Sequence, residues 1–331
     1  MLTIVDAKKR KLEDILINHA EKKLALSPRL FDAYGRDLLT GKEKFNTEKA
    51  LEKVREGKIL GTAQIVEQGE QLVFTTNAFS FSDYFALRHF ASGLVAKGEP
   101  VDDRLIAAQS ALSMIVLVET ADKHLVIGYR SGDHLANRYL SPAGFYDYQD
   151  VPDKEFIRSK VFEKVKLSLG TSSFVPVNYL GLSHDNRDSF LFVQVLYQTI
   201  PFTSAEVYNN WQRIPGEKKH EHLLFVNTEL KPLIDFIFHQ GEHTLNPYHD
   251  PSIRFKQKKM IEGPEKHVGH EYDHIENGIG SLLLYLNHKY GSAAATSLCN
   301  DIVSQKLVSG INADALTKGI DTHFLVQMKL N

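Results

Sequence analysis

The feature that most constrains this chain is an almost unbroken apolar run, SMIVLVE, at residues 113–119. Such runs are typical of strands buried on both faces, because a half-exposed strand would alternate polar and apolar residues. Ala121-Asp122-Lys123 then gives a turn signal, and residues 124–129 (HLVIGY) predict a partner strand. We therefore predict a mixed α+β or α/β core that begins near residue 113.

The segment after this hairpin predicts one helix followed by three strands and a second helix. A polar loop covers residues 130–149, and Val151-Pro152-Asp153 opens a helix with proline in its first turn. Strands are expected at 175–182, 189–198 and 222–226, with a polar loop at 184–188, and a helix is expected at 228–239. Five apolar residues share one face of the first helix: Phe156, Ile157, Val161, Val165 and Leu169.

The two ends of the chain have different patterns from the middle. Helices are predicted at 7–25, at 47–58 and at 82–95, where Ser82-Asp83 forms the cap, and a hairpin is predicted at 61–66 and 71–76. Residues 241–267 have the composition of a linker, and the pattern from residue 269 onward is helical. These changes divide the chain into an α+β domain (1–112), a central domain (113–240) and a linker with a C-terminal helical region (241–331).

The bulk composition excludes several classes of partner. The formal charge of -2 gives no basic field for nucleic acid or for an anionic membrane. No apolar run approaches the roughly 20 residues that span a bilayer. Cys299 is the single cysteine, so no intramolecular disulfide can form, and a cytoplasmic location is expected.

Two segments of the central domain carry a resemblance to a known family. Residues 140–145 (LSPAGF) occupy the position of the Pro-Gly-Gly loop that precedes the catalytic helix of Nudix hydrolases. Residues 216–230 resemble the closing segment of that family, where an acidic residue precedes a strand and the last helix. The resemblance implies an αβα sandwich and a Mg²⁺-dependent hydrolase of a nucleoside diphosphate linked to another group.

A narrower resemblance extends toward the N-terminus. Residues 28–33 (PRLFDA) and 76–84 (TNAFSFSDY) are similar to the animal Nudix subfamily that hydrolyses UDP-glucose and UDP-galactose. A nucleotide or nucleotide-sugar is therefore the implied ligand, with ADP-ribose as a related candidate. The resemblance covers roughly residues 28 to 235 and leaves the C-terminal helices unassigned; these could form a homodimer interface or a cap over the site.

The catalytic helix has lost most of the carboxylates of the family's signature. Without gaps, Asp150 takes the first Glu position and Ser159 takes a later one. With one inserted residue, Lys160 replaces the first helical Glu, and the Glu-Glu pair becomes Glu163-Lys164. In both alignments only Glu163 remains of the three helical carboxylates. A lysine at a ligand position would repel Mg²⁺ by ordinary Coulomb forces.

A reduced metal site can still be assembled from the remaining carboxylates. Glu163, Glu217 and Asp150 are the candidate Mg²⁺ ligands, and Glu163 and Glu221 are the candidate catalytic residues. The alternative interpretation of Glu163 is an ion pair with a neighbouring lysine on a solvated helix face.

Substrate contacts are predicted from basic and aromatic residues near the loop. Arg130 and Arg187, with His184, could meet a diphosphate. Gly144 and Phe145 lie where a base or ribose would approach, together with Tyr146 and Tyr148. The alternatives are surface arginines and core aromatic residues.

A competing motif lies in the C-terminal region. Residues 270–274 (HEYDH) match H-E-x-x-H, in which His270 and His274 would bind Zn²⁺ and Glu271 would act as the base. Asp273 places a charge inside the motif, and Gly269 directly before it indicates a helix start. Three functions therefore stay open: a weak Mg²⁺-dependent hydrolase, a Nudix-fold module that binds a nucleotide or a protein without hydrolysis, and a zinc hydrolase.

Overall fold

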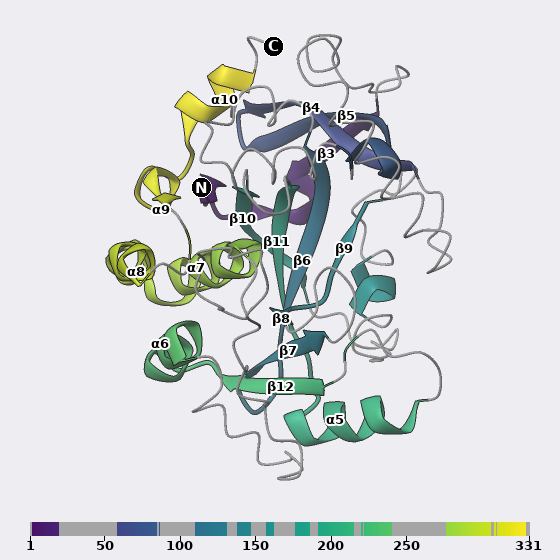
Figure 1. The fold of residues 1–331 in the computed structure, drawn as a ribbon, viewed down its shortest axis with the longest axis vertical. Coiled ribbons are helices and arrows are strands. Elements are labelled where there is room, and N and C mark those ends of the chain that lie inside the picture. Colours follow the sequence, from purple (N-terminus) through teal and green to yellow (C-terminus); the bar gives the residue numbers. More distant parts are fainter. Residues whose placement is uncertain are drawn as a thin grey trace, which may run out of the picture.

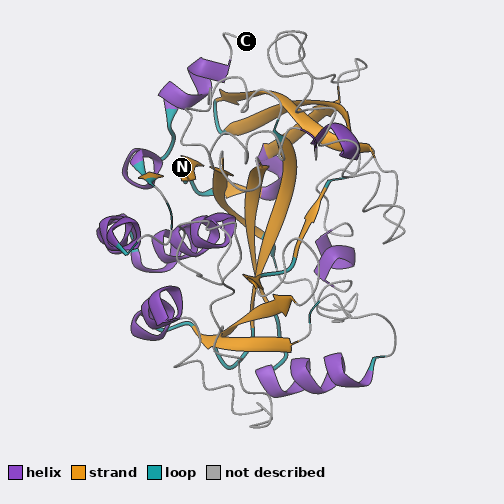
Figure 2. Ribbon diagram, in the orientation of Figure 1, coloured by secondary structure: helices purple, strands orange, loops and turns teal. Residues whose placement is uncertain are grey.

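A mixed sheet with helices packed against it forms the body of the protein (Figures 1 and 2). The computed structural model describes thirteen ranges of the chain. These are residues 2–19, 58–84, 86, 110–130, 138–146, 157–161, 176–185, 191–214, 220, 222–239, 276–305, 308 and 310–328. The strands within these ranges form a single sheet with parallel and antiparallel pairs. The predicted mixed α/β fold class is therefore confirmed.

The centre of the sheet is the parallel pair of β6 (Ala111–Glu119) and β11 (Leu191–Thr199). The two strands stay in register from Leu191↔Ala111 to Thr199↔Glu119. Every residue of β6 is buried, as the apolar run predicted. On its other side β11 pairs antiparallel with β10 (Asn178–Asp185), so the strands expected at 175–182 and 189–198 are present with shifted ends.

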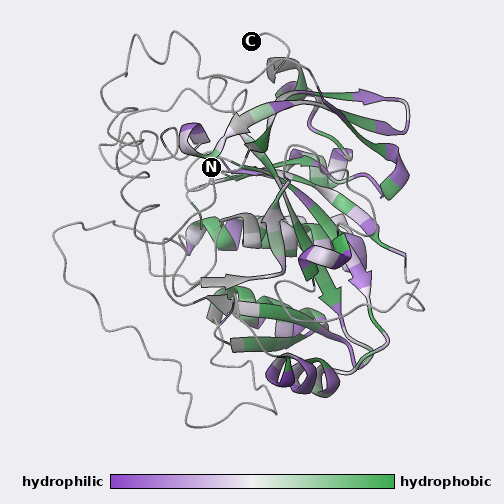
Figure 3. Cartoon of the chain, turned by 90° about the vertical axis from the view of Figure 1, so that its right-hand side faces the viewer, coloured by the Kyte–Doolittle hydropathy of each residue, from purple (hydrophilic) through white to green (hydrophobic). Residues whose placement is uncertain are grey.

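Alternate residues of β6 point into two different apolar layers. Leu112, Met114 and Val116 pack in one layer, which also holds Ile157 and Val161 of the central helix. Ile115 and Leu117 pack in the other. Burial on both faces explains why the sequence of β6 has no polar alternation, and Figure 3 shows apolar residues along the central strands. The two buried positions of the central helix, Ile157 and Val161, confirm that part of its predicted apolar face.

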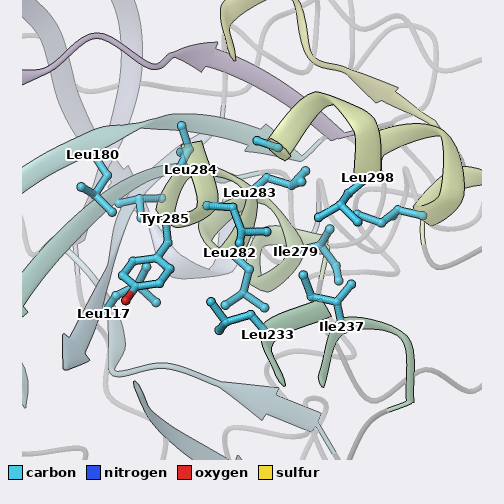
Figure 4. Packing of buried hydrophobic residues seen from close by; sticks show 14 of the residues in the cluster. Leu117, Leu180, Leu233, Ile237, Ile279, Leu282, Leu283, Leu284, Tyr285 and Leu298 are labelled. Atoms are coloured by element: carbon cyan, nitrogen blue, oxygen red, sulfur yellow. The ribbon is translucent and has the colours of Figure 1, made fainter. Parts of the chain in front are cut away.

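Helices of the C-terminal half cover the second layer. They are α6 (Leu230–His239), α7 (Glu276–Tyr290) and α8 (Ser292–Ser304). Figure 4 shows Leu282 and Leu283 of α7 between Leu233 of α6 and Leu298 of α8. The predicted helices at 228–239 and in the C-terminal region are therefore confirmed within the described residues.

The last described residues return to the N-terminal strand. Strand β13 (Ile311–Asn312) pairs parallel with β1 (Leu2–Asp6), and α9 (Asp314–Lys318) and α10 (Thr322–Met328) follow. Strands from all three predicted domains thus join one sheet, and the boundaries at 112 and 240 stay a prediction. No helix in the described part of the chain is long and apolar enough to cross a membrane.

The helix predicted at 7–25 is wrong over its described part. Strand β2 (Arg10–Lys11), a 3₁₀ turn (Leu12–Asp14) and β3 (Ile15–His19) occupy residues 10–19 instead. Ile15 and Ile17 are β-branched and favour a strand, and β3 pairs parallel with β5 (Gln71–Ser80). Residues 20–25 lie outside the described residues, as does the helix expected at 47–58 except for Lys58.

The hairpin predicted after residue 60 is confirmed and is longer than expected. Strand β4 (Lys58–Gln68) pairs antiparallel with β5, and Gly69 adopts a φ of 62° in the turn between them. Residues 81–84 are helical. The cap is Ser80 rather than Ser82, because the Oγ of Ser80 accepts a hydrogen bond from the backbone N–H of Asp83 at 3.1 Å.

The remaining elements surround the end of the sheet below β6 (Figure 1). The strands expected at 124–129 and 222–226 are present as β7 (His124–Arg130) and β12 (His222–Asn227), and Lys123 has a φ of 63° in the predicted turn. The two strands pair with each other, whereas β7 pairs with its predicted partner β6 only at Glu119↔Leu125. Helix α5 (Ser204–Arg213) was not predicted. Its signal was present in the sequence, since Thr203 and Glu206 form a reciprocal capping box.

A buried ion network ties the N-terminal segment to the hairpin. Arg10 donates from Nε and Nη2 to the two carboxylate oxygens of Asp6, each at 3.1 Å, and its Nη2 also lies 2.6 Å from Oε1 of Glu67. Asp6 and Arg10 are almost fully buried. Burial raises the pKa of Asp6, and the Arg10 guanidinium opposes that rise. The ion pairs of Arg10 therefore hold the short strand β2 in position, together with its backbone pairing.

Replacing Arg10 with methionine should destabilise the fold by about 3 to 5 kcal/mol, because Asp6 would be left as an uncompensated buried charge. Urea unfolding followed by circular dichroism measures the change. Lys8→Met is the matched control, since Lys8 contacts the same Glu67 oxygen at 2.6 Å with its side chain 38% exposed. It should cost less than about 1 kcal/mol. Equal losses in the two variants would contradict the prediction.

Candidate functional site

The segment that resembles the family's Pro-Gly-Gly loop is a short strand. Strand β9 (Ala143–Phe145) pairs antiparallel with β6, with Gly144 opposite Met114. The backbone N–H of Val116 also donates to the carbonyl of Pro142 at 2.7 Å. The prediction of a continuous loop over 130–149 is therefore wrong here and at β8 (Arg138–Leu140), because backbone pairing to β6 and β7 makes both segments extended.

The side chain of Lys160 lies across Gly144. A Cβ placed on Gly144 would meet the Cδ of Lys160 at 3.3 Å and its Cε at 3.5 Å. The neighbouring helical residues Ile157 and Val161 are fully buried, so the helix is held in position against the sheet by its apolar side. The absence of a side chain on Gly144 gives the lysine stem its room. A lysine therefore lies against this strand at the position that one alignment gives to a metal-binding glutamate.

Of the two predicted aromatic contacts in this strand, one is a core residue. Tyr146 is fully buried, and its hydroxyl donates to Oε1 of Gln194 on β11 at 2.7 Å. Phe145 is half-buried, and its ring lies 5.4 Å from that of Phe81 and 5.3 Å from that of Tyr84, edge to face. The N-terminal hairpin and its helix thus contribute the aromatic neighbours of Phe145.

Most of the predicted site residues lie outside the described residues. Arg130 is described by its backbone alone, as the last residue of β7. The others are not described: Asp150, Glu163, Glu217, Glu221, Arg187, Tyr148, His270, Glu271 and His274. Their roles stay predictions. Among the residues that the structure does describe, no three His, Cys, Asp or Glu side chains gather closely enough to hold a metal ion.

His184 was predicted on a polar loop facing a diphosphate, and the structure corrects this. It lies in β10 with 1% of its surface exposed, and its Nε2 is 2.9 Å from the Oγ of buried Ser110. Its ring centroid lies 4.4 Å from that of Phe192, with the two rings tilted by 38°. Burial lowers the pKa of His184 to about 4. Strand β10 continues through Asp185 because its pairing with β11 extends to Leu191.

The stability of the protein should fall as the pH drops from 6.5 through 4. His184 takes up a proton at about 6.5 when unfolded but only near 4 when folded, so the unfolded state binds more protons in this window. The difference corresponds to roughly 3 kcal/mol. His184→Gln should remove this part of the slope, whereas replacing the exposed His323 should retain it. Parallel stability curves for wild type and His184→Gln would disprove the assignment.

One polar cluster of the sheet was not predicted. Glu119 ends β6 and is 2% exposed, with Tyr197 of β11 and Tyr285 of α7 bonded to the same carboxylate oxygen. A carboxylate that directly ends a fully apolar run was the available signal, since buried acids require polar partners.

Comparison with known proteins gives weak structural likenesses. No protein-family model matches the chain, and no curated protein matches its sequence. The chain is similar to a bifunctional NMN adenylyltransferase/ADP-ribose pyrophosphatase from Francisella tularensis, at 11% identity and a TM-score of 0.28 over 45% of this chain. The same bifunctional protein complexed with AMP and a Mn ion gives 13% identity and a TM-score of 0.28 over 44% of this chain.

A second likeness is to Tm1382, a candidate Nudix hydrolase, at 14% identity and a TM-score of 0.25 over 58% of this chain and 86% of that one. The chain spans only 41% of the length of the bifunctional enzyme. Likenesses this weak do not establish a family for the chain.

Proposed function

We propose that this chain is a Nudix-like module that binds a nucleoside diphosphate linked to a second group, with little or no hydrolysis. The observation that carries the proposal is the stem of Lys160 lying across Gly144, at the position of a metal-binding glutamate. From residue 111 to 239 the strands and helices on which the family resemblance rests occur in the expected order, with β8, β9 and α5 in addition.

A lysine at this position changes the chemistry that the site can perform. Mg²⁺-dependent hydrolysis needs carboxylates that hold the ion, so that the ion neutralises the phosphates and activates water. An ammonium group neutralises a phosphate directly, as a point charge with three donors. It neither holds Mg²⁺ nor activates water. The diphosphate would therefore be bound by Lys160, with Arg130, Arg187 and Phe145 as further candidate contacts.

The hydrolase alternative depends on residues outside the described part of the chain. Glu163 with Asp150, Glu217 and Glu221 would have to hold Mg²⁺ beside Lys160, and turnover would be slow because the lysine repels the ion. The zinc alternative at His270 and His274 likewise depends on residues outside the described part of the chain.

Binding of UDP-glucose and ADP-ribose, measured by isothermal titration calorimetry with Mg²⁺ and with EDTA, tests the proposal. We expect equal affinities with and without the metal ion. Lys160→Gln should bind about tenfold more weakly, because it loses a charge-assisted hydrogen bond to phosphate. Lys231→Gln is the control: Lys231 is 86% exposed on α6 and pairs with Asp235. Rapid Mg²⁺-dependent turnover that Glu163→Gln abolishes would overturn the proposal.

Lys160→Glu gives a second, opposite prediction. This substitution places a carboxylate beside the strand of Gly144 and one helical turn or less from Glu163 in sequence. Nucleotide binding should then require Mg²⁺, because the new charge repels phosphate until a cation neutralises it. The ratio of affinities with and without Mg²⁺ measures the effect. An unchanged ratio would show that residue 160 does not face the phosphates.

A further inference from the structure

The cluster around Glu119 carries more positive charge than its carboxylate can neutralise. Oε2 of Glu119 accepts the hydroxyl of Tyr197 at 2.9 Å and that of Tyr285 at 2.6 Å. The Nζ of Lys123 lies 3.3 Å from Oε1, and the Nζ of Lys289 lies 3.6 Å from Oε2. Two ammonium groups thus share one buried carboxylate that two neutral donors already satisfy.

Further basic groups surround this pair. His288 lies on α7 with its ring 5.6 Å from that of Tyr197, and burial together with Lys9 and Lys289 lowers its pKa. Two other acids lie nearby. Asp122 accepts hydrogen bonds from the backbone N–H and the hydroxyl of Ser204. The charge of Glu229 contributes to the raised pKa of Tyr290. Lys123 and Lys289 therefore face Glu119 as the buried acid between them, and the charge of Lys9 acts on His288.

The cluster is separate from the site at Gly144. Met114 pairs with Gly144 and packs in the layer of Val161, whereas Leu117 packs in the layer of α7. Glu119 is two residues after Leu117 and so points to that same face. It also lies five residues along β6 from Met114, which is about 17 Å of strand. Figure 4 shows Tyr285 of α7 beside Leu117, on this second face.

The position within the sheet suits a ligand site. Glu119 and Thr199 are the last residues of the parallel strands β6 and β11, and ligands of α/β proteins bind beyond the carboxyl ends of parallel strands. The side chain of Lys123 is 68% exposed and that of Lys289 is 29% exposed, so solvent reaches part of each, and the Nζ of Lys289 also donates to the hydroxyl of Tyr285 at 3.1 Å.

We propose that this cluster is a second binding site, for a phosphate group. Lys123 and Lys289 donate to the phosphate oxygens, and the neighbouring His288 adds a donor at its edge. The buried Glu119 holds Lys289 and Tyr285 in place from beneath. This site and the proposed nucleotide site lie on opposite faces of the sheet, at different positions along β6, and share no residue. The two proposals can therefore be tested independently.

Inorganic phosphate at low ionic strength, titrated by calorimetry into the full chain, tests the site. Saturable binding is expected that weakens with added salt. Lys123→Gln and Lys289→Gln should each weaken it about tenfold. Lys318→Gln should leave it unchanged, since the ammonium of Lys318 lies 2.6 Å from Asp314 with both side chains exposed on α9, and so should Lys160→Gln. Lys123 is the more decisive variant, because its exposed side chain is not needed for folding.

The substitution Glu119→Gln distinguishes a phosphate-binding site from a purely structural contact that holds α7 against the sheet. Glutamine keeps an oxygen that accepts the tyrosine hydroxyls, and it releases both ammonium groups from the carboxylate. Phosphate affinity should therefore rise by about tenfold. Loss of thermal stability without any rise in phosphate affinity would overturn the proposal. Failure to observe saturable phosphate binding, or binding that Lys123→Gln leaves unchanged, would also overturn it.

Discussion

Strands β6 and β11 pair in parallel along their full lengths, and this pairing determines much of the rest of the fold. Parallel strands cannot be joined by a tight turn, so the chain must cross over between them. The residues of that crossover supply β7, β9, the helix at 157–161 and β10. Because both faces of β6 are apolar, the chain must also provide two covering layers. The central helix covers one, and α6 to α8 cover the other.

The same pairing separates two chemically different places on one strand. On one face, Met114 holds Gly144 in the register that leaves room for the stem of Lys160. On the other, Glu119 accepts hydrogen bonds from Tyr197 of β11 and from Tyr285 of α7, so that one hydrogen bond fixes a helix far along the chain to the end of β6. A substitution that shifts β6 by one residue would exchange these faces and disrupt both places.

The sequence predicted the elements whose signals are local. The strand β6 was visible as a continuous apolar run, and the hairpin of β4 and β5 and the buried Ile157 and Val161 were visible as sequence patterns. Prediction from the sequence failed where contacts between residues far apart in the chain determine the structure. Residues 7–25 have apolar residues at helical spacing, but Arg10 forms an ion pair with Asp6, and β3 pairs with β5 more than fifty residues away. His184 looked like a polar loop residue because its partner Ser110 is seventy-four positions away.

The site was predicted in a similarly uneven way. One alignment of the family signature put Lys160 at a metal-ligand position, but its place beside Gly144 was not predicted and comes from the structure. Periodicity could not show that Tyr146 would turn inward to Gln194, nor that Phe145 would meet Phe81 and Tyr84 of the N-terminal segment. Those contacts depend on how β9 and the helix at residues 81–84 are placed beside β6, which no single segment specifies.

The claim that a lysine replaces a metal ligand is tested most directly by a crystal structure of the chain with UDP-glucose and Mg²⁺. The expected electron density places the Nζ of Lys160 within hydrogen-bond distance of a diphosphate oxygen, with Gly144 beneath its stem and no metal ion bound to protein carboxylates. A Mg²⁺ ion held by Glu163 between the helix and the diphosphate, with Lys160 turned toward solvent, would contradict it.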